Sequence, residues 1–125
     1  MIPAYNTRIR LEVARLIRVE IARVRKSAPD LSYREAREGV LKEADRRSFS
    51  RVLKLAIWKK SKGLCAYRRD PKCREPKLNP HKWCADHILP HALGGPTILS
   101  NAQAVCLVCN RRKAAFVVRP RRRLP

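Results

Sequence analysis

Between Trp83 and Lys113 the chain carries several side chains that can move protons or bind metals, in the order WCADHILPHALGGPTILSNAQAVCLVCNRRK. An imidazole in general titrates near neutrality, so His87 is suited to take a proton from water. The neighbouring carboxylate of Asp86 is a hard oxygen ligand of the kind that Mg²⁺ prefers. A base beside a cation ligand suits metal-assisted hydrolysis. As neighbours in a regular strand, however, the two side chains would point to opposite faces.

The cysteines indicate a second, structural metal site. A C-x-x-C pair at the expected start of a helix is half of a typical zinc site. The full expected set of Zn²⁺ ligands is Cys65, Cys73, Cys106 and Cys109. Cys84 could replace Cys73, although strand alternation would place Cys84 on the same face as Asp86. Such a zinc would pin the upstream loop to the last helix and substitute for a large core.

Charge and composition narrow the function classes. The chain has 125 residues, with 30 Lys and Arg against 10 Asp and Glu, for a formal net charge of +20. That balance favours a polyanionic partner, usually nucleic acid, although a ribosomal-type or merely basic protein would share it. No apolar run approaches the roughly 20 residues of a membrane span. No secretion signal precedes the cysteines, so we expect no membrane association and a cytoplasmic location.

Three zones follow one another along the chain. Residues 1–62 read as a basic helical extension, and residues 63–117 as a core that holds the cysteines, the histidines and all four glycines. Residues 118–125 form a basic tail that we expect to be disordered. The core is therefore the segment in which the chemistry must be positioned.

Apolar spacing predicts three helices in the extension. The first covers residues 7–26, and its polar positions are mostly Arg. Ser32 is then a predicted N-cap, with Glu35 completing a capping box, and the second helix runs to about residue 43 or 47. The third covers residues 50–62, with four residues expected to face inward: Val52, Leu53, Ala56 and Ile57.

The sequence of the core predicts short strands followed by a helix. Two β-prone pieces, LCAY and KWCADHIL, lie among prolines and glycines, and a final helix is expected over residues 107–117. Trp58, just before the core, fits packing in the core or between helices better than base stacking.

Residues 55–116 resemble the HNH endonuclease family. The resemblance is carried by four segments in the family order: IWKKSKGLCAY, ADHILPHALGG, SNAQAVC and CLVCNRRK. It implies an α+β fold, a small ββα-metal (HNH) finger with structural zinc, here preceded by basic α-helices. The resemblance is specific because all four segments occur together.

The resemblance also implies a role for each site residue. His87 corresponds to the general base, Asp86 to a ligand of a catalytic Mg²⁺ or Mn²⁺, and Asn110 to the second ligand. Where the family has His at that last position, this chain has Asn, a common variant. Asn101 corresponds to the residue that holds the loop near His87 through backbone hydrogen bonds.

Basic and histidine side chains around this motif are candidates for further contacts. Arg111, Arg112 and Lys113 lie beside the expected site and are candidate nucleic-acid contacts. His91 could contact phosphate, bind metal or lie on the surface, and His81 is expected on the surface.

The implied activity is cleavage of DNA, with double strands favoured, to 5′-phosphate and 3′-hydroxyl ends. Basic standalone members of this kind resemble phage or mobile-element proteins of a bacterial host, and the chain could form a homodimer. Two alternatives stay open. The chain could be a catalytically silent, zinc-stabilised nucleic-acid-binding module, or an accessory subunit of a phage packaging or recombination machine.

Overall fold

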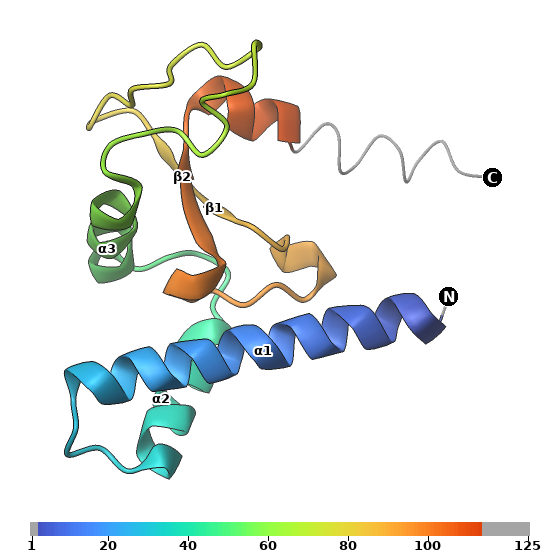
Figure 1. Ribbon diagram of the computed structural model, residues 1–125, viewed down its shortest axis with the longest axis vertical. Helices are drawn as coiled ribbons and strands as arrows, with labels where there is room; N and C mark the ends of the chain where they lie inside the picture. The colour runs from blue at the N-terminus through green and yellow to red at the C-terminus, as the bar shows by residue number, and fades with distance from the viewer. Residues whose placement is uncertain (1–2, 114–125) are drawn as a thin grey trace. The chain divides into compact units, whose positions relative to one another are not determined.

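A computed structural model describes residues 3–113 of the chain (Figure 1). Its elements, in order, are α1 (Pro3–Ser27), α2 (Tyr33–Ala44), α3 (Arg51–Ser61), β1 (Cys84–His87), η1 (His91–Leu93), η2 (Leu99–Asn101) and β2 (Ala102–Val105). The strands β1 and β2 pair in one antiparallel sheet, so the predicted α+β class is confirmed. None of the helices described is long and apolar enough to cross a membrane.

A last helical segment follows β2 at residues 107–113. Its start agrees with the predicted helix over residues 107–117. The remainder of that prediction, and the predicted basic tail at residues 118–125, lie outside the described residues.

The chain divides into two compact units. Unit one contains the residues up to 54 together with residues 87–102, and unit two contains residues 55–86 together with the chain from residue 103. The boundary predicted after residue 62 lies inside unit two, and the three-zone domain division stays a prediction.

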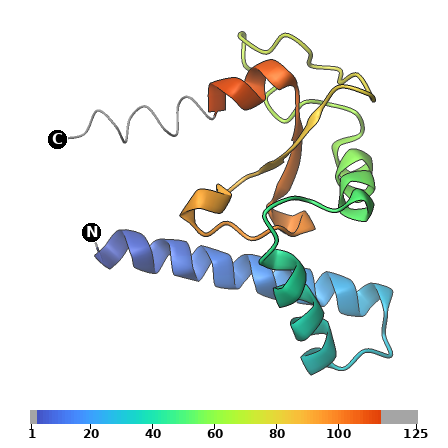
Figure 2. The ribbon, with the colours of Figure 1, turned by 180° about the vertical axis from the view of Figure 1, so that it is seen from behind.

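The core of unit one forms where α1 packs against α2 (Figures 1 and 2). Its buried members come from both helices and from the segment before η2: Leu16, Ile21, Ala36, Val40, Ala44 and Ile98. The helix α1 begins before the predicted residue 7. Proline is tolerated in a first helical turn, so Pro3 can open the helix.

Side-chain caps set the starts of the other two helices. The Ser32 Oγ accepts the Glu35 backbone N–H at 3.1 Å, which confirms the predicted N-cap of α2. The Ser50 Oγ accepts the Leu53 N–H at 3.2 Å at the start of α3. The expectation that Val52 faces inward is wrong, because 76% of this residue is exposed. The buried positions of this helix are Leu53 and, one turn later, Ile57. Val52 is next to Leu53 in the chain, so its side chain points about 100° away around the helix.

Unit two begins with the second half of α3 and the loop that follows it. Trp58 packs against Trp83 with ring centroids 5.5 Å apart, so the expected packing role of Trp58 is confirmed. The helix ends where Gly63 takes a positive φ of 73°, a conformation that suits glycine. The β-prone piece LCAY forms no strand; only Leu64 pairs, in an isolated bridge with Lys77.

Candidate active site

The loop that follows β1 in unit one is held in a tight turn. Gly94 has a φ of 95°, and a Cβ on Gly95 would lie 1.7 Å from the Leu89 carbonyl oxygen. Only glycine allows the two backbone segments to approach this closely. The conformation of the loop therefore requires its two glycines, independently of any side-chain contact.

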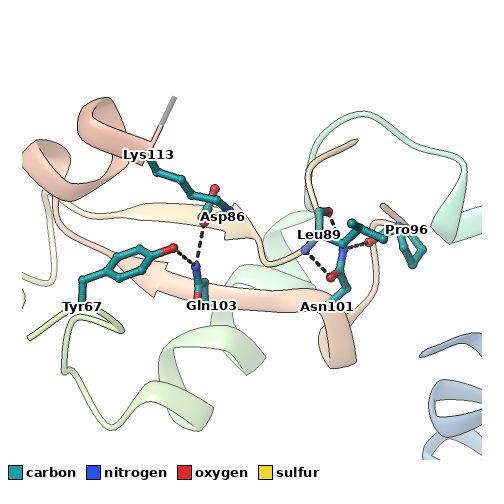
Figure 3. A network of polar contacts seen from close by, with 7 residues as sticks. All are labelled: Tyr67, Asp86, Leu89, Pro96, Asn101, Gln103 and Lys113. Atoms are coloured by element: carbon teal, nitrogen blue, oxygen red, sulfur yellow. Dashed lines mark hydrogen bonds and ion pairs between the residues drawn. The ribbon is translucent and has the colours of Figure 1, made fainter. Parts of the chain in front are cut away.

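Asn101 ties the same loop together from the end of η2. Its Nδ2 donates to the carbonyl oxygens of Leu89 at 3.0 Å and Pro96 at 2.9 Å. Its Oδ1 accepts the Leu89 N–H at 2.8 Å, and the residue is 1% exposed (Figure 3). These are the backbone hydrogen bonds expected of Asn101, and they confirm that it holds the loop. Its place in a catalytic site stays a prediction.

His87 is the last residue of β1 and belongs to unit one. Its Nε2 lies 2.9 Å from the hydroxyl oxygen of Thr97. The Phe49 ring packs against the imidazole with centroids 4.4 Å apart, and the His91 ring lies 5.5 Å away. His91 is exposed, as is His81. The predicted base is thus half-buried, in contact with the Thr97 hydroxyl and with the rings of Phe49 and His91.

Asp86 precedes His87 in the chain but belongs to unit two. Its Oδ2 accepts from Lys113 Nζ at 2.6 Å and from Gln103 Nε2 at 2.8 Å (Figure 3). The Gln103 Nε2 also donates to the Tyr67 hydroxyl at 3.1 Å. The Lys113 and Asp86 side chains are only 17% and 14% exposed, so this ion pair is shielded from water. The Lys113 ammonium therefore contacts the Asp86 carboxylate, which is also the predicted ligand of the catalytic ion.

The other predicted residues near the C-terminal helical segment have separate surroundings. Asn110 is half-buried, and its backbone N–H donates to the Cys106 carbonyl at 3.0 Å within the first helical turn. Arg112 pairs with Asp70 at 3.5 Å, whereas Arg111 is exposed. Of the three predicted nucleic-acid contacts, two are therefore engaged in ion pairs within the chain.

Four cysteines of unit two converge as predicted. The sulfur atoms of Cys65, Cys73, Cys106 and Cys109 all lie within 4.8 Å of one another. Zn–S bonds of about 2.3 Å place tetrahedral sulfurs about 3.8 Å apart, so the cluster is positioned to bind a zinc-sized ion. Cys73, rather than Cys84, completes the set among the described residues.

Backbone hydrogen bonds shape the loop that brings the first two thiols to the C-x-x-C pair. The Cys65 N–H donates to the Pro76 carbonyl, and the Cys73 N–H to the Asp70 carbonyl, both at 2.9 Å. The N–H of Ala66, which follows Cys65, donates to the carbonyl of Ala104 in β2 at 2.9 Å. The thiols are therefore positioned by the polypeptide itself.

The electrostatics of the cluster favour at least one thiolate. Burial opposes ionisation of Cys106, but hydrogen bonds from Cys109 and Cys65 outweigh it and lower its pKa to about 7. The Cys109 N–H donates to the Cys106 sulfur at 3.4 Å, as expected for a sulfur at a helix N-terminus. Burial raises the pKa of the Cys109 and Cys73 thiols. A cation would offset that burial, because metal binding displaces the thiol protons.

Comparison with known proteins bears on the assignment of this region. Residues 72–124 match the HNH endonuclease family. The match confirms the resemblance seen in the motifs, and it suggests nuclease activity. No curated protein and no solved structure matches the chain.

The HNH match covers most predicted site residues but begins after Cys65. It also leaves out the helices of unit one and Tyr67. Three residues that were not predicted contact the predicted base or ligand, namely Phe49, Thr97 and Gln103, and Tyr67 in turn contacts Gln103. Of these, only Gln103 carried a local signal, as the one polar residue within the run AQAV that forms β2.

Proposed function

We propose that the chain is a metal-dependent endonuclease that hydrolyses phosphodiester bonds of double-stranded DNA. The observation that carries the proposal is the pair Asp86 and His87 at the end of β1, inside the HNH match, each held by its own hydrogen bonds. A base and an anionic ligand that follow one another in the chain supply the two functions that phosphodiester hydrolysis requires.

His87 is the proposed general base. Water would give its proton to the imidazole while its oxygen bonds to phosphorus and the bond from phosphorus to the 3′ oxygen breaks. The 3′ oxygen then takes a proton from solvent. The products are a 5′-phosphate and a 3′-hydroxyl. Removal of such a base costs about 100-fold or more in rate.

Asp86 and Asn110 are the proposed protein ligands of the catalytic ion. A carboxylate and an amide oxygen suit Mg²⁺ or Mn²⁺, which when bound would neutralise charge on the phosphate and leaving oxygen. Lys113 already donates to Asp86, so the carboxylate must exchange or share this partner. Because the protein offers few ligands, we expect weak binding of the ion.

Structural Zn²⁺ is the proposed occupant of the four-cysteine cluster. The thiols are closer than 4.8 Å to one another and three of them are buried, which suits a closed tetrahedral site. The proposal predicts about one zinc per chain after purification.

The arginines of α1 are the proposed phosphate contacts. Exposed guanidinium groups occur along this helix at Arg8, Arg10, Arg15, Arg18, Arg23 and Arg25. Within the described part of the helix, Arg15 pairs with Glu12 and Arg23 pairs with Glu20. Binding that depends on so many phosphate contacts should weaken steeply as salt is raised.

A plasmid cleavage assay tests the activity directly. The wild type should nick or linearise the plasmid with Mg²⁺ or Mn²⁺ and be inactive in EDTA. The His87→Ala variant should bind DNA and retain its zinc but not cleave. Equal cleavage by the variant would reject His87 as the base.

A second function, a catalytically silent DNA-binding module, is favoured by one observation. The ammonium of Lys113 neutralises the Asp86 carboxylate in a shielded ion pair, which is what a site without a catalytic ion would need. Retardation of the plasmid in a gel, with no cleavage under any divalent ion, would identify this function.

A further inference from the structure

Thr97 is a fully buried residue of the loop in unit one, with 0% of its surface exposed. Its backbone N–H donates to the carbonyl of Ala44, the last residue of α2, at 3.0 Å. Its hydroxyl donates to the carbonyl of Arg46, two residues further on. Carbonyls at the end of a helix lack partners within the helix, so the Thr97 N–H satisfies one group that α2 leaves open, and the hydroxyl bonds to the turn that follows.

The oxygen of the same hydroxyl lies 2.9 Å from His87 Nε2. The number of protons available determines which of these two groups donates. A hydroxyl has a single proton, and a carbonyl oxygen has none. The hydrogen bond from the Thr97 hydroxyl to the Arg46 carbonyl uses that proton. The Thr97 oxygen must therefore accept from His87, so Nε2 carries a hydrogen. In the neutral imidazole the lone pair is then on Nδ1.

We infer that Thr97 is a positioning residue that holds His87 in the tautomer with hydrogen on Nε2, using the backbone carbonyl of Arg46 as its anchor. The inference rests on the proposed function only for its effect on catalysis. In that setting Nδ1 is the atom that accepts the proton of the attacking water, and Thr97 touches neither substrate nor ion.

Further contacts tie this arrangement to the basic helices. Phe49, just before α3, packs on the imidazole that Thr97 contacts. Ser100 donates through its hydroxyl to the Leu16 carbonyl at 3.1 Å, and its N–H donates to buried Glu20 at 3.3 Å, which fixes the loop to α1. The helical extension thus supplies the surroundings of His87 as well as candidate phosphate contacts.

The test compares Thr97→Val, which keeps the shape but removes the hydroxyl, with Thr97→Ser, which restores it. Nitrogen-15 NMR of the full chain at a pH where histidine is neutral distinguishes a protonated from an unprotonated ring nitrogen. His87→Gln identifies the His87 signals among the three histidines. We expect hydrogen on Nε2 in the wild type and in Thr97→Ser. In Thr97→Val the tautomers should mix, and the Nε2 hydrogen should exchange faster with solvent.

Plasmid cleavage by the same proteins gives the second readout. Thr97→Val should lose about 10- to 100-fold in rate, as when the partner that orients a functional histidine is removed. Thr97→Ser should recover most of it. Thermal unfolding of both variants separates this effect from loss of fold.

Two results would overturn the inference. One is a wild-type His87 with hydrogen on Nδ1; the other is a folded Thr97→Val variant with unchanged NMR signals and unchanged activity. If the wild type cleaves no DNA but its His87 signals respond to Thr97→Val as expected, the positioning role stands and the proposed nuclease function fails.

Discussion

Asp86 and His87 are neighbours in β1, yet their side chains are held in different ways. His87 contacts a neutral chain of groups, a threonine hydroxyl and a backbone carbonyl, with an aromatic ring against its face. Asp86 contacts a charged ammonium and an amide, in the unit that also contains the cysteine cluster. Neutral hydrogen bonds can fix the hydrogen of an imidazole without changing its charge. A cationic partner instead neutralises the carboxylate it contacts.

The contrast matches the proposed division of labour. A general base needs its lone pair directed and available, whereas an ion ligand needs negative charge. On the Asp86 side, Lys113 supplies compensating charge that a divalent ion would otherwise supply. Removal of a metal should therefore affect unit two first. A substitution in the loop that follows β1 should affect unit one first.

The largest effect is expected from the cysteine cluster. Cys109→Ser should lose zinc and unfold unit two, because structural zinc contributes directly to folding. Cys84→Ser is the matched control, since Cys84 lies outside the cluster, and it should keep about one zinc per chain. Zinc content and thermal unfolding measure both. A zinc-free Cys109→Ser protein with wild-type stability would contradict a structural metal.

Asn101→Ala should be the most damaging single change on the His87 side. It removes three hydrogen bonds and leaves buried backbone groups of Leu89 and Pro96 without this partner. The expected cost is about 3 kcal/mol in the free energy of unfolding, measured by urea denaturation. Asn79→Ala is the control, because the Asn79 side chain accepts the His81 N–H within an exposed turn. Similar losses in the two variants would show that the loop does not depend on Asn101.

Lys113→Gln should strengthen ion binding moderately, whereas the two changes above are expected to cause losses. Without the ammonium on Asp86, Mn²⁺ should bind about fivefold more tightly, corresponding to roughly 1 kcal/mol. Isothermal titration with Mn²⁺ measures this in the absence of DNA. Arg112→Gln is the control, since its ion pair with Asp70 is more exposed. Weaker Mn²⁺ binding by Lys113→Gln would show that the lysine does not compete with the ion.

The smallest effect is expected from Tyr67→Phe. The change removes the hydroxyl that accepts from Gln103 and leaves the contact of Gln103 with Asp86 in place. A loss of about 1 kcal/mol or less in stability is expected. Gln103→Leu, which removes both hydrogen bonds, should lower stability further. If Tyr67→Phe were the more damaging of the two, the chain of contacts through Gln103 would not be what supports Asp86.

Local signals in the sequence predicted much of the fold. Ser32 and Glu35 marked the start of α2, and the spacing of the C-x-x-C pair marked a helix start with two of the four clustered thiols. Both features depend on residues within a few positions of each other, where spacing alone determines geometry.

Contacts between distant residues could not be predicted in this way. Thr97 meets a carbonyl 51 positions earlier, and Lys113 meets Asp86 across 27 positions. No periodicity relates such pairs, because the packing of whole elements brings them together. The strand β2 was also missed, since its Ala-Gln-Ala-Val sequence has little β-propensity of its own.

The most direct test is plasmid cleavage measured over a series of Mg²⁺ and Mn²⁺ concentrations for the wild type, Asp86→Ala and His87→Ala. We predict that Asp86→Ala regains part of its activity at high metal concentration, whereas His87→Ala stays inactive at every concentration. Cleavage by His87→Ala at the wild-type rate, or a wild type that cleaves under no condition, would contradict the proposed division between base and ion ligand.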